Sequence, residues 1–145
     1  MGDSGSVVRP YLLETEAIPV MVDVVSTSEE GFETVNEVRE FTSTIDATGE
    51  NSPDTLETLV AAYASCYVPA LRVGGEQRGV EDLGEIDIHA TGEHDEDEKL
   101  ESIEFEVTVE ADVDDGKMEE VVERANELCK VHDALKESLE AEVTF

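Results

Sequence analysis

The chain contains two cysteines, Cys66 and Cys129, which lie 63 positions apart. The thiolate form of cysteine attacks electrophiles and binds metals, so two cysteines that meet in space could carry out redox or metal chemistry. Free cysteine is also a common small core residue, an interpretation that requires no chemistry. A permanent disulfide is disfavoured in the cytoplasm, so proximity of the two thiols would favour a catalytic, redox-sensing or metal-binding pair.

The sequence around Cys66 predicts a helix over residues 52–73. Ser52 is the expected N-cap, Pro53 suits the first helical position, and Asp54 complements the helix dipole. Apolar residues recur at steps of three and four: Leu56, Leu59, Val60, Tyr63, Cys66, Tyr67, Ala70 and Leu71. With roughly 13 apolar residues against the ~20 needed to cross a bilayer, this helix is expected inside a core or a subunit interface.

Two sequence features are expected to shape the C-terminal part of this helix. Pro69 removes a backbone hydrogen-bond donor and predicts a kink just past Cys66, which would aim the thiol at a cleft. Gly74 and Gly75 predict the end of the helix. Cys129 falls on the apolar stripe of a second predicted helix, residues 117–129, followed by a short helix over 131–139 and a closing strand over 141–145.

β-branched and alternating segments predict strands elsewhere. Residues 18–26 and 32–38 form a predicted hairpin, and residues 39–46 add a third strand in which Arg39 shares a face with Phe41 and Ile45. Residues 81–90 and the strictly alternating residues 100–111 predict a second hairpin, and the acidic run 91–98 between them is expected to be a solvated loop.

Length and composition favour one α+β domain spanning residues 1–145, because the chain has 145 residues and 39% hydrophobic content. The expected parts are a β-rich segment over about 1–50, the helix 52–73, the hairpin 80–111, and a second cysteine helix with a C-terminal strand over 115–145. The first 17 residues are either a frayed start or a first strand.

The net charge of -29 makes nucleic acid and anionic membranes poor partners, because both require a positive surface. No signal-like segment opens the sequence, which favours the cytoplasm. The acids are interleaved with periodic apolar residues, a pattern typical of ordered proteins from salt-loving cells.

Three segments resemble the OsmC/Ohr family of thiol peroxidases: DATGENSP at 46–53, LETLVAAYASC at 56–66 and CKVHDAL at 129–135. The order and spacing agree with the family's two cysteine signatures over residues 38–139, and His132 favours the OsmC-like branch. Pro53 lies farther from the cysteine than the family's proline, Pro69 is unusual, and Lys130 replaces the common proline.

The resemblance implies an intertwined homodimer with curved antiparallel sheets around central helices, and an antioxidant activity toward organic hydroperoxides. In that mechanism Cys66 attacks the peroxide, Cys129 forms a disulfide with it, and a dithiol reductant resets the pair without a cofactor. Arg39 is the candidate for the charge that stabilises the Cys66 thiolate, and Glu57 for its carboxylate partner; Glu57 is equally well read as an ordinary first-turn acid.

Two alternatives stay open on the residues alone. Cys66, Cys129 and His132, with Asp133 as a fourth ligand, have side chains that suit zinc. A redox-sensing or small-ligand-binding protein of the same fold, with little turnover, would also retain the two cysteines.

The charge generates the first testable prediction. Self-repulsion at a net charge of -29 is screened by ions, so we expect the Tm to be higher in molar salt than in low salt. Thermal melts at both salt concentrations measure this difference. An unchanged Tm would contradict the salt-adapted interpretation.

Overall fold

The structure of the protein is a computed structural model that describes residues 21–135. The predictions for the first 17 residues and for a closing strand over 141–145 lie outside the described residues. The elements, in order, are β2 (Val25–Thr27), β3 (Glu33–Val38), β4 (Phe41–Asp46), α1 (Thr55–Gln77), β5 (Ile86–His94), β6 (Leu100–Val109), α2 (Asp115–Leu128) and α3 (Lys130–Leu135).

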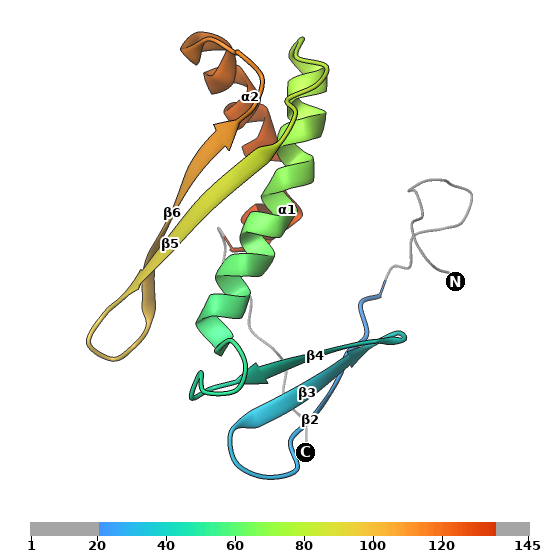
Figure 1. The fold of residues 1–145 in the computed structure, drawn as a ribbon, viewed down its shortest axis with the longest axis vertical. Helices are drawn as coiled ribbons and strands as arrows, with labels where there is room; N and C mark the ends of the chain where they lie inside the picture. The colour runs from blue at the N-terminus through green and yellow to red at the C-terminus, as the bar shows by residue number, and fades with distance from the viewer. Residues whose placement is uncertain (1–20, 136–145) are drawn as a thin grey trace.

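Two antiparallel sheets flank the long helix α1 (Figure 1). The three-stranded sheet, in the order β2-β3-β4, lies beyond the N-terminal end of α1, whereas the β5–β6 hairpin runs alongside the helix. α2 packs against the C-terminal half of α1. The predicted α+β class with antiparallel sheets is therefore confirmed.

α1 begins at Thr55, and its N-cap is Asp54. The Asp54 carboxylate accepts a hydrogen bond from the Glu57 N–H, and the Glu57 carboxylate accepts one from the Asp54 N–H, both at 2.9 Å. This capping box satisfies two backbone donors, so the prediction of Ser52 as the cap is wrong. Pro53 stays outside the helix, where its carbonyl accepts the N–H of Asp46 at the end of β4.

α1 continues through Pro69, Gly74 and Gly75 to Gln77, so the predicted stop at the two glycines is also wrong. Both glycines are buried, and a Cβ added at Gly74 would lie 3.1 Å from the Val121 carbonyl oxygen on α2. Gly74 therefore serves close packing of α1 on α2, whereas Gly75 lets the loop after α1 approach the helix, with the Val80 carbonyl oxygen 3.1 Å from its would-be Cβ. Among residues 21–135, no helix has the length and apolar character to span a membrane.

The core forms where α1 crosses α2 and meets the loop before β5. Its buried members are Tyr67, Ala70, Leu71, Leu83, Val121, Ala125 and Cys129. The inward-facing residues of β5 and β6, among them Ile88, Phe105 and Val107, pack against this core. The alternation predicted for residues 100–111 is thus confirmed as β6.

Arg39 does not belong to a strand, contrary to the prediction of a third strand over 39–46. Val38 pairs with Phe41, which leaves Arg39 and Glu40 as a two-residue hairpin turn. Such turns require a positive φ, and Arg39 has a φ of 55°. Its guanidinium lies 4.9 Å from the centre of the Phe41 ring.

The acidic run 91–98 is not wholly a loop, because β5 extends to His94. Thr91 pairs with Glu104 and Glu93 with Ser102, so cross-strand pairing overrides the polar composition of this segment. The chain reverses between Asp95 and Lys99, whose backbone groups are joined at 2.8 Å.

The helix crossing generates the second prediction. Gly74→Ala forces a methyl group against the α2 backbone, which should lower the free energy of unfolding by about 1–3 kcal/mol. Val73→Ala is the matched control, because Val73 is exposed on the same turn of α1. Denaturant unfolding of the two variants measures the difference; equal stabilities would contradict the packing role of Gly74.

Candidate functional site

Cys129 is the first residue after α2, not a residue within the helix as the sequence predicted. Its N–H donates to the Ala125 carbonyl at 2.9 Å, while its extended backbone (φ -73°, ψ 117°) turns the chain into α3. The residue is 1% exposed, and Cys66 on α1 is half-buried. Both are free thiols.

The turn from Cys129 to His132 brings several backbone donors to the two sulfurs. The His132 N–H donates to Cys129 Sγ at 3.4 Å, and the Asp133 N–H donates to the Cys129 carbonyl at 3.1 Å. Cys129 therefore occupies the position of an N-cap for α3, with sulfur in place of the usual oxygen acceptor. The next two N–H groups, of Lys130 and Val131, are directed at Cys66.

The pKa of Cys66 lies below its ordinary value. Burial raises this pKa, but the N–H of Val131, the thiol of Cys129, the N–H of Lys130 and the positive charge of Lys130 together outweigh it. All four favourable groups come from the junction between α2 and α3. This junction therefore creates the conditions for a thiolate at Cys66.

The pKa of Cys129 is shifted in the opposite direction. Burial raises it, and the neighbouring Cys66 raises it further through its hydrogen bond and its charge, against the opposing hydrogen bond from the His132 N–H. The two thiols are therefore unequal: Cys66 ionises first, while Cys129 keeps its proton and donates it toward Cys66.

Two tyrosines of α1 flank the thiols and pack edge-on against Phe105 of β6. The Tyr63 hydroxyl lies 2.6 Å from Nδ1 of His132, and the Tyr67 hydroxyl donates to Asn126 at 2.8 Å. Burial, together with Cys129 and Cys66, raises the pKa of Tyr63, so its hydroxyl keeps its proton and shares a hydrogen bond with the His132 imidazole.

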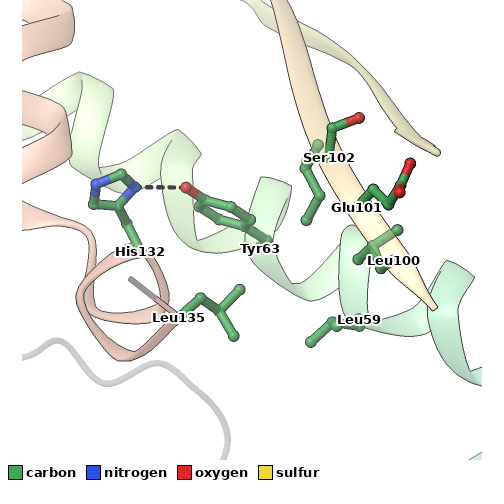
Figure 2. A pocket seen from close by; sticks show the side chains of 8 residues that line it. Leu59, Tyr63, Leu100, Glu101, Ser102, His132 and Leu135 are labelled. Atoms are coloured by element: carbon green, nitrogen blue, oxygen red, sulfur yellow. Dashed lines mark hydrogen bonds between the residues drawn. The ribbon is translucent and has the colours of Figure 1, made fainter. Parts of the chain in front are cut away.

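An open groove of about 350 Å³ lies beside the Tyr63–His132 pair (Figure 2). It is lined by Leu59, Tyr63, Leu100, Glu101, Ser102, Ile103, His132 and Leu135. Most of this lining is apolar, with polar groups at the His132 end and along β6. Such a groove suits an apolar molecule with one polar end.

Arg39 and Glu57 are not brought together within one chain. Arg39 lies over Phe41 in the β3–β4 turn, and Glu57 forms the capping box at the start of α1. Across residues 21–135 no ion pair joins these two side chains, and the positive charge that acts on Cys66 is Lys130. The interpretation of Glu57 as a first-turn acid agrees with its observed contacts.

The candidate zinc ligands do not converge either. In the part of the chain that the structure describes, no group of three or more His, Cys, Asp and Glu side chains is placed to hold a metal ion. Nδ1 of His132 faces the Tyr63 hydroxyl instead (Figure 2).

Comparison with known proteins identifies the family. The family model described as OsmC-like protein matches residues 47–144, a segment that includes both cysteines and the whole site. The chain belongs to the OsmC family. A relative of this OsmC-like protein, an uncharacterized protein of Haloferax volcanii, is 46% identical over 117 residues, which cover 81% of this chain and 89% of the relative. That source is consistent with the expectation, drawn from the net charge, of a salt-adapted surface.

Solved structures share the OsmC-like fold. An OsmC-like protein from Mycoplasma pneumoniae superposes with a TM-score of 0.72 at 15% identity, covering 82% of this chain and 89% of that one. The organic hydroperoxide resistance protein OhrB of Bacillus subtilis gives a TM-score of 0.59 at 21% identity, covering 78% and 88%. The OsmC-like fold expected from the resemblance is confirmed.

Sequence reasoning missed the groups that lower the pKa of Cys66 in this OsmC-like protein. In the sequence, Lys130 stands out only as a replacement for the family's proline, and the resemblance favours Arg39 as the source of positive charge. The N–H groups of Lys130 and Val131 have no sequence signal, since their direction depends on where α2 ends. Tyr63 was assigned only to the apolar stripe of α1.

The position of Lys130 generates the third prediction. Lys130→Gln removes a positive charge that favours the Cys66 thiolate, so the pKa of Cys66 should rise. The alkylation rate of Cys66 at pH 7 and low salt should then fall by about two- to threefold, and the loss should shrink in high salt because Lys130 is exposed.

Lys117→Gln on the first turn of α2 is the matched control, because it makes the same charge change away from the thiols. Iodoacetamide kinetics with mass-spectrometric assignment of the alkylated cysteine measure both variants. Equal rates in the two variants would contradict a local effect of Lys130.

Proposed function

We propose that this OsmC-like protein is a thiol-dependent peroxidase that reduces organic hydroperoxides to alcohols. The observation that carries the proposal is the unequal pair of neighbouring thiols, with the pKa of Cys66 lowered and that of Cys129 raised. A nucleophile and a protonated partner in contact are what a two-cysteine peroxidase requires. The hydroperoxide resistance named for the OhrB structure lends support.

In the proposed cycle, the Cys66 thiolate attacks the terminal oxygen of the hydroperoxide, and the O–O bond breaks. The alkoxide takes up a proton and leaves as the alcohol, while Cys66 becomes a sulfenic acid. Cys129 then attacks the Cys66 sulfur, the S–S bond forms, and the sulfenic oxygen leaves as water. An external dithiol supplies two electrons and restores both thiols, so the cycle needs no cofactor.

The apolar groove favours an organic hydroperoxide over hydrogen peroxide as substrate. Leu59, Leu100, Ile103 and Leu135 offer an apolar chain a place close to the thiols, because Tyr63 and His132 belong both to the groove and to the surroundings of the cysteines. The proposed compartment is the cytoplasm, where dithiol reductants are maintained.

The working form that we propose is an intertwined homodimer. Seven of the nine exposed large hydrophobic side chains among the described residues lie between residues 21 and 41: Met21, Val22, Val24, Val25, Phe32, Val35 and Phe41. These exposed apolar side chains lie on the β2-β3-β4 sheet and on the segment just before it, and they form the surface that a second subunit would cover. Arg39 and Glu57 retain their proposed roles only across that interface.

The fourth prediction separates the two cysteines. Cys66→Ser should abolish peroxide consumption, because it removes the nucleophile. Cys129→Ser should consume about one equivalent of an organic hydroperoxide and leave Cys66 as a sulfenic acid that dimedone traps. Mass spectrometry of the wild type after one equivalent should show a Cys66–Cys129 disulfide.

The same experiment tests the alternatives. Full peroxide consumption by Cys66→Ser would overturn the mechanism, and disulfide formation without turnover in the presence of a dithiol would indicate a redox sensor. The variant Arg39→Met tests whether Arg39 stabilises the Cys66 thiolate. A peroxide reaction that is slower near neutral pH and recovers at higher pH supports this role across the dimer interface, whereas an unchanged rate excludes Arg39 from the site.

A further inference from the structure

α3 is a six-residue helix with no fully buried residue, yet groups of its first turn lower the pKa of Cys66 and donate a hydrogen bond to Cys129. The N–H groups of Lys130 and Val131 and the Lys130 charge act on Cys66, and the His132 N–H donates to Cys129 Sγ. A helix this short gains little stability from its own backbone hydrogen bonds. Its position must therefore come from contacts with the rest of the fold.

His132 is tied to two places at once. Its backbone N–H donates to the sulfur of Cys129, and its Nδ1 shares a hydrogen bond of 2.6 Å with the hydroxyl of Tyr63, a residue 69 positions away on α1 (Figure 2). The Tyr63 ring is itself fixed, since its centre lies 4.7 Å from that of Phe105 and 6.5 Å from that of Tyr67. The pair is part-buried, where a hydrogen bond meets less competition from water.

We propose that Tyr63 and His132 are positioning residues whose hydrogen bond holds the α2–α3 turn against α1, and thereby keeps Cys129 and the N–H groups of Lys130 and Val131 in place around Cys66. This inference deepens the proposed function, since it concerns the same thiol pair. Neither side chain needs to touch the peroxide for this role.

The second tyrosine of the same helix provides an internal comparison. Tyr67 also packs on Phe105 and also donates its hydroxyl across to another helix, but its acceptor is Asn126 on α2. α2 is already fixed by the buried residues Val121 and Ala125. Loss of the Tyr67 hydroxyl therefore leaves the α2–α3 turn where it is, whereas loss of the Tyr63 hydroxyl releases it.

The groups that face Cys66 determine the expected readout. They are Tyr63 on its own helix, and Cys129 and Lys130 from the turn, with the Lys130 and Val131 N–H groups. If the turn moves away, Cys66 loses the hydrogen bonds and the charge that favour its thiolate but stays in its apolar surroundings. Its thiolate fraction near neutral pH must then fall.

The fifth prediction uses four variants of the full chain. In Tyr63→Phe and His132→Leu, alkylation of Cys66 by iodoacetamide at pH 7 should slow by about 3- to 10-fold, the factor that corresponds to one hydrogen bond. The rate should return toward that of the wild type at high pH, where Cys66 is ionised in every variant. In His132→Asn, whose amide oxygen can take the place of Nδ1, and in Tyr67→Phe, the pH profile should match the wild type.

Alkylation does not require peroxide turnover, so this measurement stands or falls separately from the peroxidase proposal. A wild-type profile in Tyr63→Phe would overturn the inference, as would an equal shift in Tyr63→Phe and Tyr67→Phe. An equally large loss in His132→Asn and His132→Leu would also overturn it, since the acceptor would then be irrelevant. A rate that stays low at high pH would show a blocked thiol and not a displaced turn.

Discussion

The candidate site depends on one constraint: the charged thiolate form of Cys66 must be stabilised although this residue lies on an apolar helix. Burial alone would keep Cys66 protonated, because it penalises the charged form. The compensation is supplied mainly by backbone: two N–H groups at the start of α3, helped by the Cys129 thiol and by the Lys130 charge. Backbone donors act only at short range and in one direction. The pKa of Cys66 therefore depends on the placement of one turn.

The crossing of α1 and α2 is what allows that placement. Gly74 has no side chain at the point where α1 and α2 touch, so the two helices pack closely. As a result, Cys129 at the end of α2 lies beside Cys66 on α1. Phe105 supports the tyrosines from the β6 side. The same packing that stabilises the core thus determines the geometry of the thiols.

Much of this fold could be predicted from the sequence, because hydrophobic periodicity identified both cysteine helices and strand β6. Signals with two interpretations misled the prediction: Gly74 and Gly75 predict a helix end, but a buried glycine equally serves close packing, against α2 for Gly74 and against the following loop for Gly75. The prediction that Arg39 lies in a strand failed because a two-residue turn without glycine or asparagine has no clear sequence signal. The pairing of Cys66 with Cys129 followed from the resemblance, whereas the amide donors required the structure.

The burial of Cys129 gives the proposed cycle a direction. In a Cys66–Cys129 disulfide the two sulfurs differ in accessibility, since Cys129 is 1% exposed and Cys66 is half-buried. An incoming dithiol would meet the sulfur of Cys66, form the mixed disulfide there, and expel Cys129 as the leaving group. The His132 N–H already donates to that sulfur and would offset part of the burial that raises the pKa of the departing Cys129 thiol. In the proposed cycle the dithiol reductant therefore needs a thiol that can reach the Cys66 sulfur on α1. The shape of the reductant around that thiol then determines which reductants the protein accepts.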